Sequence, residues 1–195
     1  MWEQFLNTYF IYNGVGWAVL GGMAAVMFGC IGSAIGIRIA CSQAAGVLSE
    51  KPDLFGKLLV LMALPGTQGF YGFICAIFIS MKINLIASID QAVKLAPPIG
   101  ISLLFVGTCV GVVQLISAIN QGMTSAASIN LVGKRPEEGG RAILFPALVE
   151  TYAVVALLVG ILMTFWLTAP LSSPLTRLEE LFSTAVSMMT GICLV

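Results

Sequence analysis

The sequence predicts an all-α membrane protein whose four transmembrane helices form two tandem hairpins. Of its 195 residues, 58% are hydrophobic and 9% are charged, whereas soluble domains carry about 25% charged residues. A helix needs roughly 20 apolar residues to span a bilayer. Stretches of that kind lie at about 14–46, 58–81, 97–131 and 142–168. The second half of the chain also repeats the first, which turns four spans into two related hairpins.

The repeat is clearest where the first and third spans end. SAIGIRIACSQAAGVLSEKP (33–52) aligns without a gap with SAINQGMTSAASINLVGKRP (117–136), and the two segments begin 84 residues apart. The same offset places Glu150 opposite Gly66. The duplicated hairpin therefore carries a carboxylate inside the membrane in one half only.

The repeat and the charges define the predicted organisation. We expect a first transmembrane hairpin at 11–83, a loop at 84–96, a second hairpin at 97–168 and a C-terminal extension at 169–195. Short loops rich in Lys and Arg stay in the cytoplasm. The basic residues that flank the two hairpin turns are Lys51, Lys57, Lys134, Arg135 and Arg141. We therefore predict a multi-pass protein of the cell membrane with both hairpin turns cytoplasmic and both termini outside.

Small residues recur every three or four positions in the first and third spans. Such stripes let helix backbones approach closely in lipid. They indicate either tight packing inside one four-helix bundle or crowding along the inner wall of a ring of identical copies. The positions are Gly14, Ala18, Gly22, Ala25, Gly29, Gly32 and Gly36, and then Gly100, Gly107, Gly111, Ala118, Gly122 and Ser125.

Glu150 lies well inside the fourth predicted span, within ALVETYAVV. A charged side chain at the bilayer centre costs about 2.5–3.5 kcal/mol on insertion scales, and such residues mark ion or proton pathways. Burial favours the neutral form of a carboxyl group. An ionised Glu150 therefore needs a cation beside it.

The second and third spans supply polar partners for this carboxylate. In LPGTQGFYGF, positions 64, 67, 68 and 71 follow the spacing i, i+3, i+4, i+7 and share one helical face. Proline and glycine at 65 and 66 disturb the helix there, so that nearby carbonyl groups can turn towards a ligand. Gln121 in the third span lies opposite the apolar Ile37 of the first half. The predicted oxygen-rich set comprises Thr67, Gln68, Gln121 and Glu150, with Tyr71 beside it.

This set of side chains suits a small monovalent cation. Hard cations take several oxygen ligands, and one carboxylate with neutral oxygens balances a single positive charge, as Na⁺ requires. Tyr71 is expected to hydrogen-bond the carboxylate and fix its direction. A proton needs only the carboxyl group and one or two hydrogen-bond partners, so H⁺ is the alternative. We expect no organic cofactor and no enzymatic activity in this chain, since it has neither a nucleotide-binding loop nor a nucleophile–base set.

These motifs resemble those of the membrane-rotor proteolipids of bacterial V-type ATPases, subunit K, and specifically the sodium-transporting form. The resemblance rests on LPGTQGFYGF, on NQG at 120–122, on GKRPEEGGRAILFPALVETYAV and on the missing carboxylate of the first hairpin. It covers about residues 11–168. It implies a homo-oligomeric ring that turns against a stator membrane subunit while other subunits hydrolyse ATP.

The resemblance also implies roles for individual residues. The ion would be held by the main-chain carbonyl of Leu64 and by the side chains of Thr67, Gln68, Gln121 and Glu150, which make the predicted Na⁺ site. Tyr71 would hydrogen-bond the glutamate. The cytoplasmic loops 47–57 and 132–141 would meet the central stalk, and a stator arginine would release the ion.

The extension at 169–195 departs from the family pattern. Thr176 and Glu179 have the spacing of a capping box that opens a short helix, and too few apolar residues follow for a fifth span. Three roles are open for the segment: it lies at the outer interface, plugs the ring lumen or forms a disordered tail.

A stand-alone pore or small transporter is a competing function, with its site between the repeats. Such transporters usually have more spans, and one carboxylate per two hairpins fits a repeating ring better. A purely structural scaffold would leave the oxygen cluster unexplained.

Overall fold

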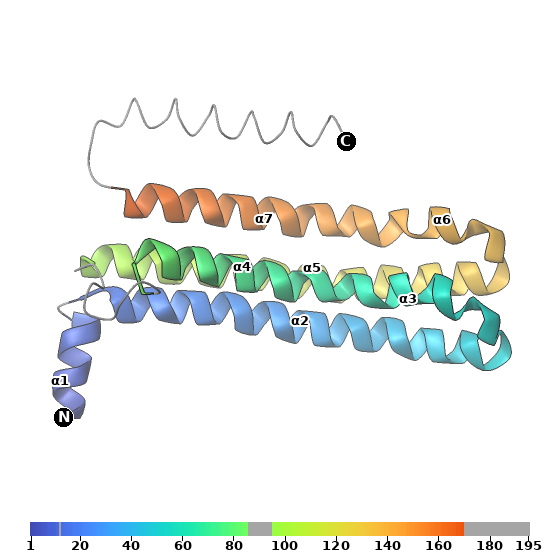
Figure 1. The fold of residues 1–195 in the computed structure, drawn as a ribbon, viewed down its shortest axis with the longest axis horizontal. Coiled ribbons are helices and arrows are strands. Elements are labelled where there is room, and N and C mark those ends of the chain that lie inside the picture. Colours follow the sequence, from blue (N-terminus) through green and yellow to red (C-terminus); the bar gives the residue numbers. More distant parts are fainter. Residues whose placement is uncertain (12, 86–94, 170–195) are drawn as a thin grey trace.

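The chain folds as an elongated bundle of antiparallel helices (Figure 1). The structure is a computed structural model and describes residues 1–11, 13–85 and 95–169. Helical segments long and apolar enough to cross a membrane run over Val15–Glu50, Pro52–Lys82, Pro97–Lys134 and Pro136–Thr168. The predicted all-α fold with four spans is therefore confirmed. Most of the loop at 84–96 and nearly all of the extension at 169–195, including the predicted capping box, lie outside the described residues.

The first half of the chain contains one long helix and one interrupted helix. Helix α2 (Val15–Glu50) has 36 residues and is about 54 Å long at 1.5 Å per residue, so it extends beyond a hydrocarbon core of about 30 Å. The other elements are α1 (Trp2–Leu6), the π-helix η1 (Asn7–Ile11), the 3₁₀-helix η2 (Pro52–Leu54), α3 (Phe55–Ala63), the 3₁₀-helix η3 (Leu64–Gly66) and α4 (Thr67–Lys82).

The second half repeats this layout in its backbone. Its elements are α5 (Pro97–Lys134), the 3₁₀-helix η5 (Pro136–Glu138), α6 (Gly139–Ala142) and α7 (Leu144–Thr168). Helix α2 ends at Lys51 with φ −134° and ψ 73°, and α5 ends at Arg135 with φ −136° and ψ 86°. In both places a 3₁₀-helix with proline at its start follows. The 84-residue offset thus relates two nearly identical hairpin turns.

The second helix of the first hairpin and the second helix of the second hairpin differ at one point. The second span is broken by η3, where Pro65 lacks the amide that would continue the helical ladder. Helix α7 continues unbroken through the equivalent positions, Val149 and Glu150. The break packs against both long helices, α2 and α5.

The two long helices, α2 and α5, pack backbone against backbone. A Cβ atom built on Gly122 would lie 2.5 Å from the Cα of Gly36, and one built on Gly32 would lie 2.7 Å from the Cα of Leu115. Small residues permit this approach, so packing inside one bundle accounts for much of the stripe. Helix α4 packs on α2, and α7 packs on α5 and α4.

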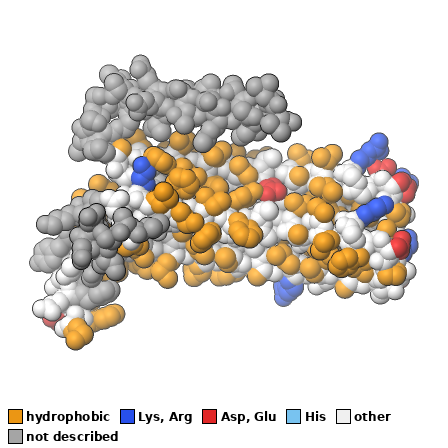
Figure 2. All heavy atoms as spheres, viewed as in Figure 1, with side chains coloured by type: hydrophobic (Ala, Val, Ile, Leu, Met, Phe, Trp, Pro, Cys, Tyr) orange, Lys and Arg blue, Asp and Glu red, His pale blue; other side chains and the backbone are white. Residues whose placement is uncertain are grey.

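Two apolar cores lie at opposite ends of the bundle. One contains Ala18, Ala25, Cys75, Ile79 and Leu103, and the other, near the hairpin turns, contains Ala40, Leu58, Leu61, Ile129 and Ala142. Hydrophobic side chains also cover the long sides of the molecule, while Lys, Arg, Asp and Glu gather chiefly at the end that holds the hairpin turns (Figure 2). The polar residues predicted from the second, third and fourth spans lie between the two cores.

Candidate ion-binding site

Glu150 is partly buried on α7 and is held by two other helices. Its Oε1 accepts a hydrogen bond of 2.6 Å from the hydroxyl of Tyr71 on α4. Its Oε2 accepts a longer one, of 3.4 Å, from the Nε2 of Gln121 on α5. Both carboxylate oxygens are therefore oriented by side chains that were predicted to surround them.

Two fully buried glutamines continue this network. The Nε2 of Gln68 on α4 donates to the Oε1 of Gln121, and the Nε2 of Gln121 also donates to the main-chain carbonyl of Pro146, 3.1 Å away. A connected row of amide groups thus runs from α4 through α5 to α7 beside Glu150.

Leu64 and Thr67 lie at the helix break and contact each other. The Thr67 hydroxyl donates to the Leu64 carbonyl over 3.0 Å, and the same hydroxyl lies within hydrogen-bonding reach of Tyr71. The break therefore presents a carbonyl oxygen and a hydroxyl oxygen one turn before the tyrosine that contacts the carboxylate. All six predicted residues are within this region.

The Oε1 of Gln68 is buried and has no hydrogen-bond partner among the described residues. An unsatisfied buried polar atom costs about 1–3 kcal/mol, so each one requires an explanation. A cation coordinated by this oxygen would remove the penalty.

The candidate site has one charged side chain, that of Glu150. Over the described part of the chain, no three His, Cys, Asp or Glu side chains come together as a group that could hold a metal ion. A single carboxylate among neutral oxygens suits a monovalent cation, whereas divalent hard cations are usually held by more carboxylate charge.

Several further polar residues on α5 were not among the predicted site residues, although Ser125 was named in the small-residue stripe. Gln114 is buried, with its Nε2 2.9 Å from the Ala153 carbonyl of α7 and its Oε1 without a partner in the described chain. Ser125 and Ser128 are also buried, and their hydroxyl groups likewise have no described partner. These side chains share one buried stripe of α5 with Gln121.

The repeat contained a signal for these residues. At the 84-residue offset, Gln114, Ser125 and Ser128 lie opposite Cys30, Cys41 and Ala44. Cys30 and Cys41 are exposed on α2, whereas Gln114 and Ser125 are buried on α5, so the second hairpin has polar residues at positions where the first has none. Gln121 was predicted from this comparison, and the same comparison applied along the whole of α5 would have found the others.

Residues 20–79 and 104–163 each match the family of ATP synthase C subunits. The chain belongs to this family. The two matches cover more than half of the chain and are separated by the same 84 residues as the repeat. Together with the four apolar helices, membership in this proteolipid family makes the chain a multi-pass membrane protein.

Two curated relatives extend the match. The chain is 35% identical over 151 residues to the V-type sodium ATPase subunit K of Enterococcus hirae, which covers 77% of this chain and 92% of the relative. It is also 35% identical over 146 residues to the A-type ATP synthase subunit K of Methanocaldococcus jannaschii, which covers 75% of this chain and 60% of the relative. The resemblance to subunit K proteolipids is thereby confirmed.

Proposed function

We propose that the chain is a rotor-ring proteolipid of a V-type rotary ATPase and carries Na⁺ across the membrane at a site centred on Glu150. ATP hydrolysis in other subunits would drive the transport, and this chain would be a non-catalytic ion-translocating component. The observation that carries the proposal is a lone intramembrane carboxylate, oriented by Tyr71 and Gln121, beside the buried and unpaired Oε1 of Gln68. The sodium ATPase named for the Enterococcus relative supports Na⁺ as the ion.

The proposed ligands are oxygen atoms from three helical segments. They are the Leu64 carbonyl, the Thr67 hydroxyl, the amide oxygens of Gln68 and Gln121, and the Glu150 carboxylate. Tyr71 would remain a hydrogen-bond donor that fixes the direction of the carboxylate. One Na⁺ would cancel the single negative charge of this set.

Charge cancellation couples ion binding to rotation. A carboxylate neutralised by Na⁺ passes into lipid more easily than an ionised one, because an uncompensated buried charge is strongly unfavourable. At the stator, an arginine is expected to compete for Glu150 and release the ion into a half-channel. A copy with an empty ionised site would resist moving back into lipid, so that rotation follows occupancy.

The two hairpin turns are joined by hydrogen bonds and together form one surface, which we propose meets the central stalk. Lys51 Nζ donates to the Gly133 carbonyl over 2.6 Å, and Lys57 Nζ donates to the Pro136 carbonyl over 3.0 Å. The loops 47–57 and 132–141 are therefore tied to each other at one end of the bundle. We propose that this end is cytoplasmic and meets the stalk, with the 84–96 loop and both termini on the outer side.

H⁺ is the second candidate ion. The hydrogen bonds that Glu150 receives from Tyr71 and Gln121 are sufficient for a protonated carboxyl group. They do not account for the unpaired oxygen of Gln68, for which Na⁺ coordination supplies a partner.

The decisive experiment is labelling of the purified ring with a hydrophobic carbodiimide, which modifies protonated buried carboxyl groups. Labelling is measured by mass spectrometry at fixed pH, with NaCl in one arm and choline chloride at equal ionic strength in the other. Protection of Glu150 by Na⁺ is expected, and Glu150→Gln supplies the unlabelled control. Labelling that is indifferent to Na⁺ would support H⁺. A protein that is purely monomeric in mild detergent would favour the stand-alone transporter.

A further inference from the structure

The long helices α2 and α5 expose complementary faces. At the 84-residue offset, Gly32 and Gly36 are buried in α2, whereas their equivalents in α5, Ile116 and Asn120, are exposed. Another stripe of α2 shows the opposite relation, because its residues are exposed while their equivalents in α5 are covered. Its exposed residues Met23, Met27, Ile31, Ala34 and Arg38 correspond to Gly107, Gly111, Leu115, Ala118 and Gly122, which are buried or partly buried in α5.

This pattern has a geometric cause. Inside one chain, the Gly32 and Gly36 face of α2 packs on the Leu115 and Gly122 face of α5. These two faces are not equivalent at the 84-residue offset, so the contact is of the head-to-tail kind. Each chain therefore leaves one face of each kind unpaired, and such heterologous contacts continue from copy to copy until they close a ring.

We infer that the exposed face of α5 receives α2 of a second copy, in the register that joins α2 to α5 within one chain, and that Arg38 of that copy hydrogen-bonds Asn120. The inference rests on the ring of the proposed function and adds the contacting face, the register and a polar pair.

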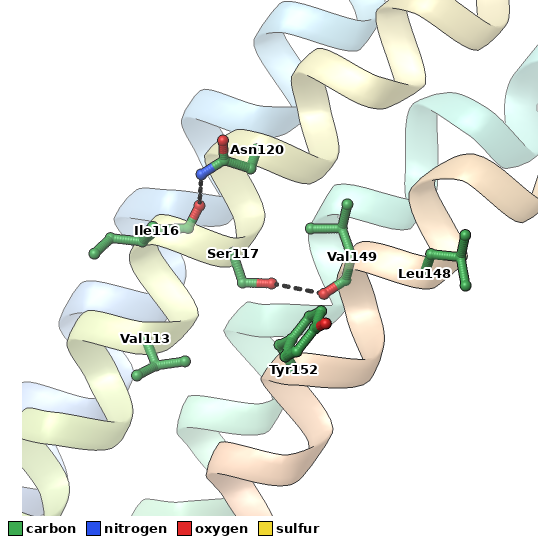
Figure 3. A pocket seen from close by; sticks show the side chains of 7 residues that line it. All are labelled: Val113, Ile116, Ser117, Asn120, Leu148, Val149 and Tyr152. Atoms are coloured by element: carbon green, nitrogen blue, oxygen red, sulfur yellow. Dashed lines mark hydrogen bonds between the residues drawn. The ribbon is translucent and has the colours of Figure 1, made fainter.

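A groove between α5 and α7 marks the docking surface. It has a volume of about 420 Å³ and is lined almost entirely by apolar atoms. Its residues are Val113, Ile116, Ser117 and Asn120 of α5 and Leu148, Val149 and Tyr152 of α7 (Figure 3). The equivalent positions of the first hairpin lie on α2, η3 and α4.

Inside the chain, that equivalent region is occupied by α5. Gly32 and Gly36 of α2 approach the backbone of α5 so closely that an added Cβ atom on either would clash with it. The internal contact therefore shows what fills a surface of this kind, and a second copy carries the matching helix.

The internal contacts fix the register of the external ones. Ala25 lies against Gly111 and Gly32 against Leu115 within the chain. Moving each pair by the 84-residue offset places Cys109 against Met27 of the second copy and Ile116 against Ile31 of the second copy. The side chains of all four residues are exposed in the single chain.

Arg38 is the polar element of this interface. It is exposed on α2, well inside the helix, and forms no ion pair with any described residue. Left in lipid, a central arginine costs about 2.5–3.5 kcal/mol on insertion scales. A partner in the ring would remove much of that penalty.

Asn120 is placed to be that partner. The internal contact of Gly36 with Gly122 becomes a contact of Asn120 with Arg38 of the second copy when it is moved by the same offset. The Nδ2 of Asn120 already donates to the Ile116 carbonyl over 2.8 Å, and its Oδ1 accepts no hydrogen bond from the described chain. The guanidinium group supplies the missing donor, and the larger side chains hold these helices further apart than the glycine pair does.

Disulfide cross-linking tests the register. In a background with Cys30, Cys41, Cys75 and Cys193 replaced by alanine, Met27→Cys should form a disulfide with the native Cys109 of the next copy under mild oxidation. A non-reducing gel should show a ladder of dimers, trimers and larger species, because each copy uses both faces. The register control is Ala34→Cys, about 10 Å further along α2, which should give no ladder with Cys109. It should give one with Asn120→Cys, because the internal contact of Gly36 with Ala118 becomes a contact of Asn120 with Ala34 of the second copy.

The failure of the register and the failure of the ring are separable. Native mass spectrometry of the same protein before oxidation reports whether a large oligomer exists. A large oligomer without a ladder from either cysteine pair would overturn the inferred interface. A ladder that stops at the dimer would also overturn it, whereas a protein that is only monomeric would refute the ring itself.

The polar pair has its own measurement. Asn120→Leu should lower the temperature at which the oligomer dissociates in dodecyl sulfate, because it leaves the guanidinium group without a partner. Arg38→Leu with Asn120→Leu should recover a large part of that loss. A double variant that is no more stable than Asn120→Leu alone would show that the two side chains do not interact.

Discussion

Tyr71→Phe is the sharpest test of how the carboxylate is controlled. The substitution removes one oxygen atom and keeps the ring, so the packing of α4 changes little. The lost hydroxyl donates to Glu150 Oε1 over 2.6 Å. It should therefore affect the balance between the ion-bound and the protonated forms of the site rather than the fold.

The size of the effect follows from the charge on the acceptor. A hydrogen bond to a charged group contributes about 1.5–3 kcal/mol, against about 0.5–1.5 kcal/mol for a neutral pair. The tyrosine thus favours the ionised, Na⁺-bound carboxylate over the protonated one by roughly 1–1.5 kcal/mol. A difference of about 1.4 kcal/mol is a factor of ten, so about ten times more Na⁺ should be needed to protect Glu150.

The assay is carbodiimide labelling of the ring over a series of Na⁺ concentrations at fixed pH. Tyr152→Phe is the matched control, because Tyr152 is two residues from Glu150 on the same helix but is exposed in the groove between α5 and α7, and its hydroxyl forms no hydrogen bond with Glu150 among the described contacts. We expect the half-protection concentration to rise for Tyr71→Phe and to stay within twofold for the control. An unchanged value for Tyr71→Phe would refute the assigned role of the hydroxyl.

Three further predictions follow from the same contacts. Glu150→Gln should abolish Na⁺ transport in the reconstituted complex while a ring of normal size still forms, and normal transport would exclude the proposed site. Gln121→Ala should weaken Na⁺ protection by one to two orders of magnitude, since it removes an oxygen ligand and the hydrogen bonds to Gln68 and Glu150; unaltered protection would remove it from the ligand set. Gly122→Val should destabilise the bundle by at least the 1–3 kcal/mol typical of overpacking, measured as thermal loss of helix by circular dichroism, while Gly46→Ala, with no atom within 4 Å, should be tolerated.

The fold was predictable because composition and repetition constrain it strongly. Apolar runs define the four spans, and the 84-residue offset relates the two turns at Lys51 and Arg135. The ends of the long helices were less accurate, since α2 reaches Glu50 and α5 reaches Lys134 beyond their apolar runs. In these extensions the backbone hydrogen bonds of the helix continue past the apolar run, so hydrophobicity no longer indicates where the helix ends.

The candidate site was predictable where helical spacing fixes which side chains share a face. Tyr71 and Gln68 lie on one side of α4 for that reason and do meet Glu150 and Gln121, respectively. The seven-residue spacing of Gln114 from Gln121 does not distinguish it from an ordinary helix–helix contact, and its only signal is that it lies opposite Cys30 at the 84-residue offset.

Arg38 escaped for a different reason. The predictions used basic residues near the helix ends and acidic residues within the spans, so a basic residue inside a span had no place in them. Its significance comes from the packing of α2 on α5, which leaves Arg38 exposed while its counterpart at the 84-residue offset, Gly122, is buried. Sequence alone does not reveal which face of α2 is left uncovered.

The charge of a single Na⁺ in the proposed site would explain the loss of symmetry at Gly66. The first hairpin would contribute the neutral oxygens of Leu64, Thr67 and Gln68, and the second would contribute the amide oxygen of Gln121 and the carboxylate. A second glutamate at position 66 would leave one negative charge uncompensated when a single Na⁺ binds, at a cost of about 2.5–3.5 kcal/mol near the bilayer centre. Sterically there is room for a side chain, since a Cβ atom there would meet just the tip of the Ile37 side chain, at 3.3 Å. The glycine therefore fits a requirement for charge balance better than one for space, because a second carboxylate there would be one charge too many for a single Na⁺.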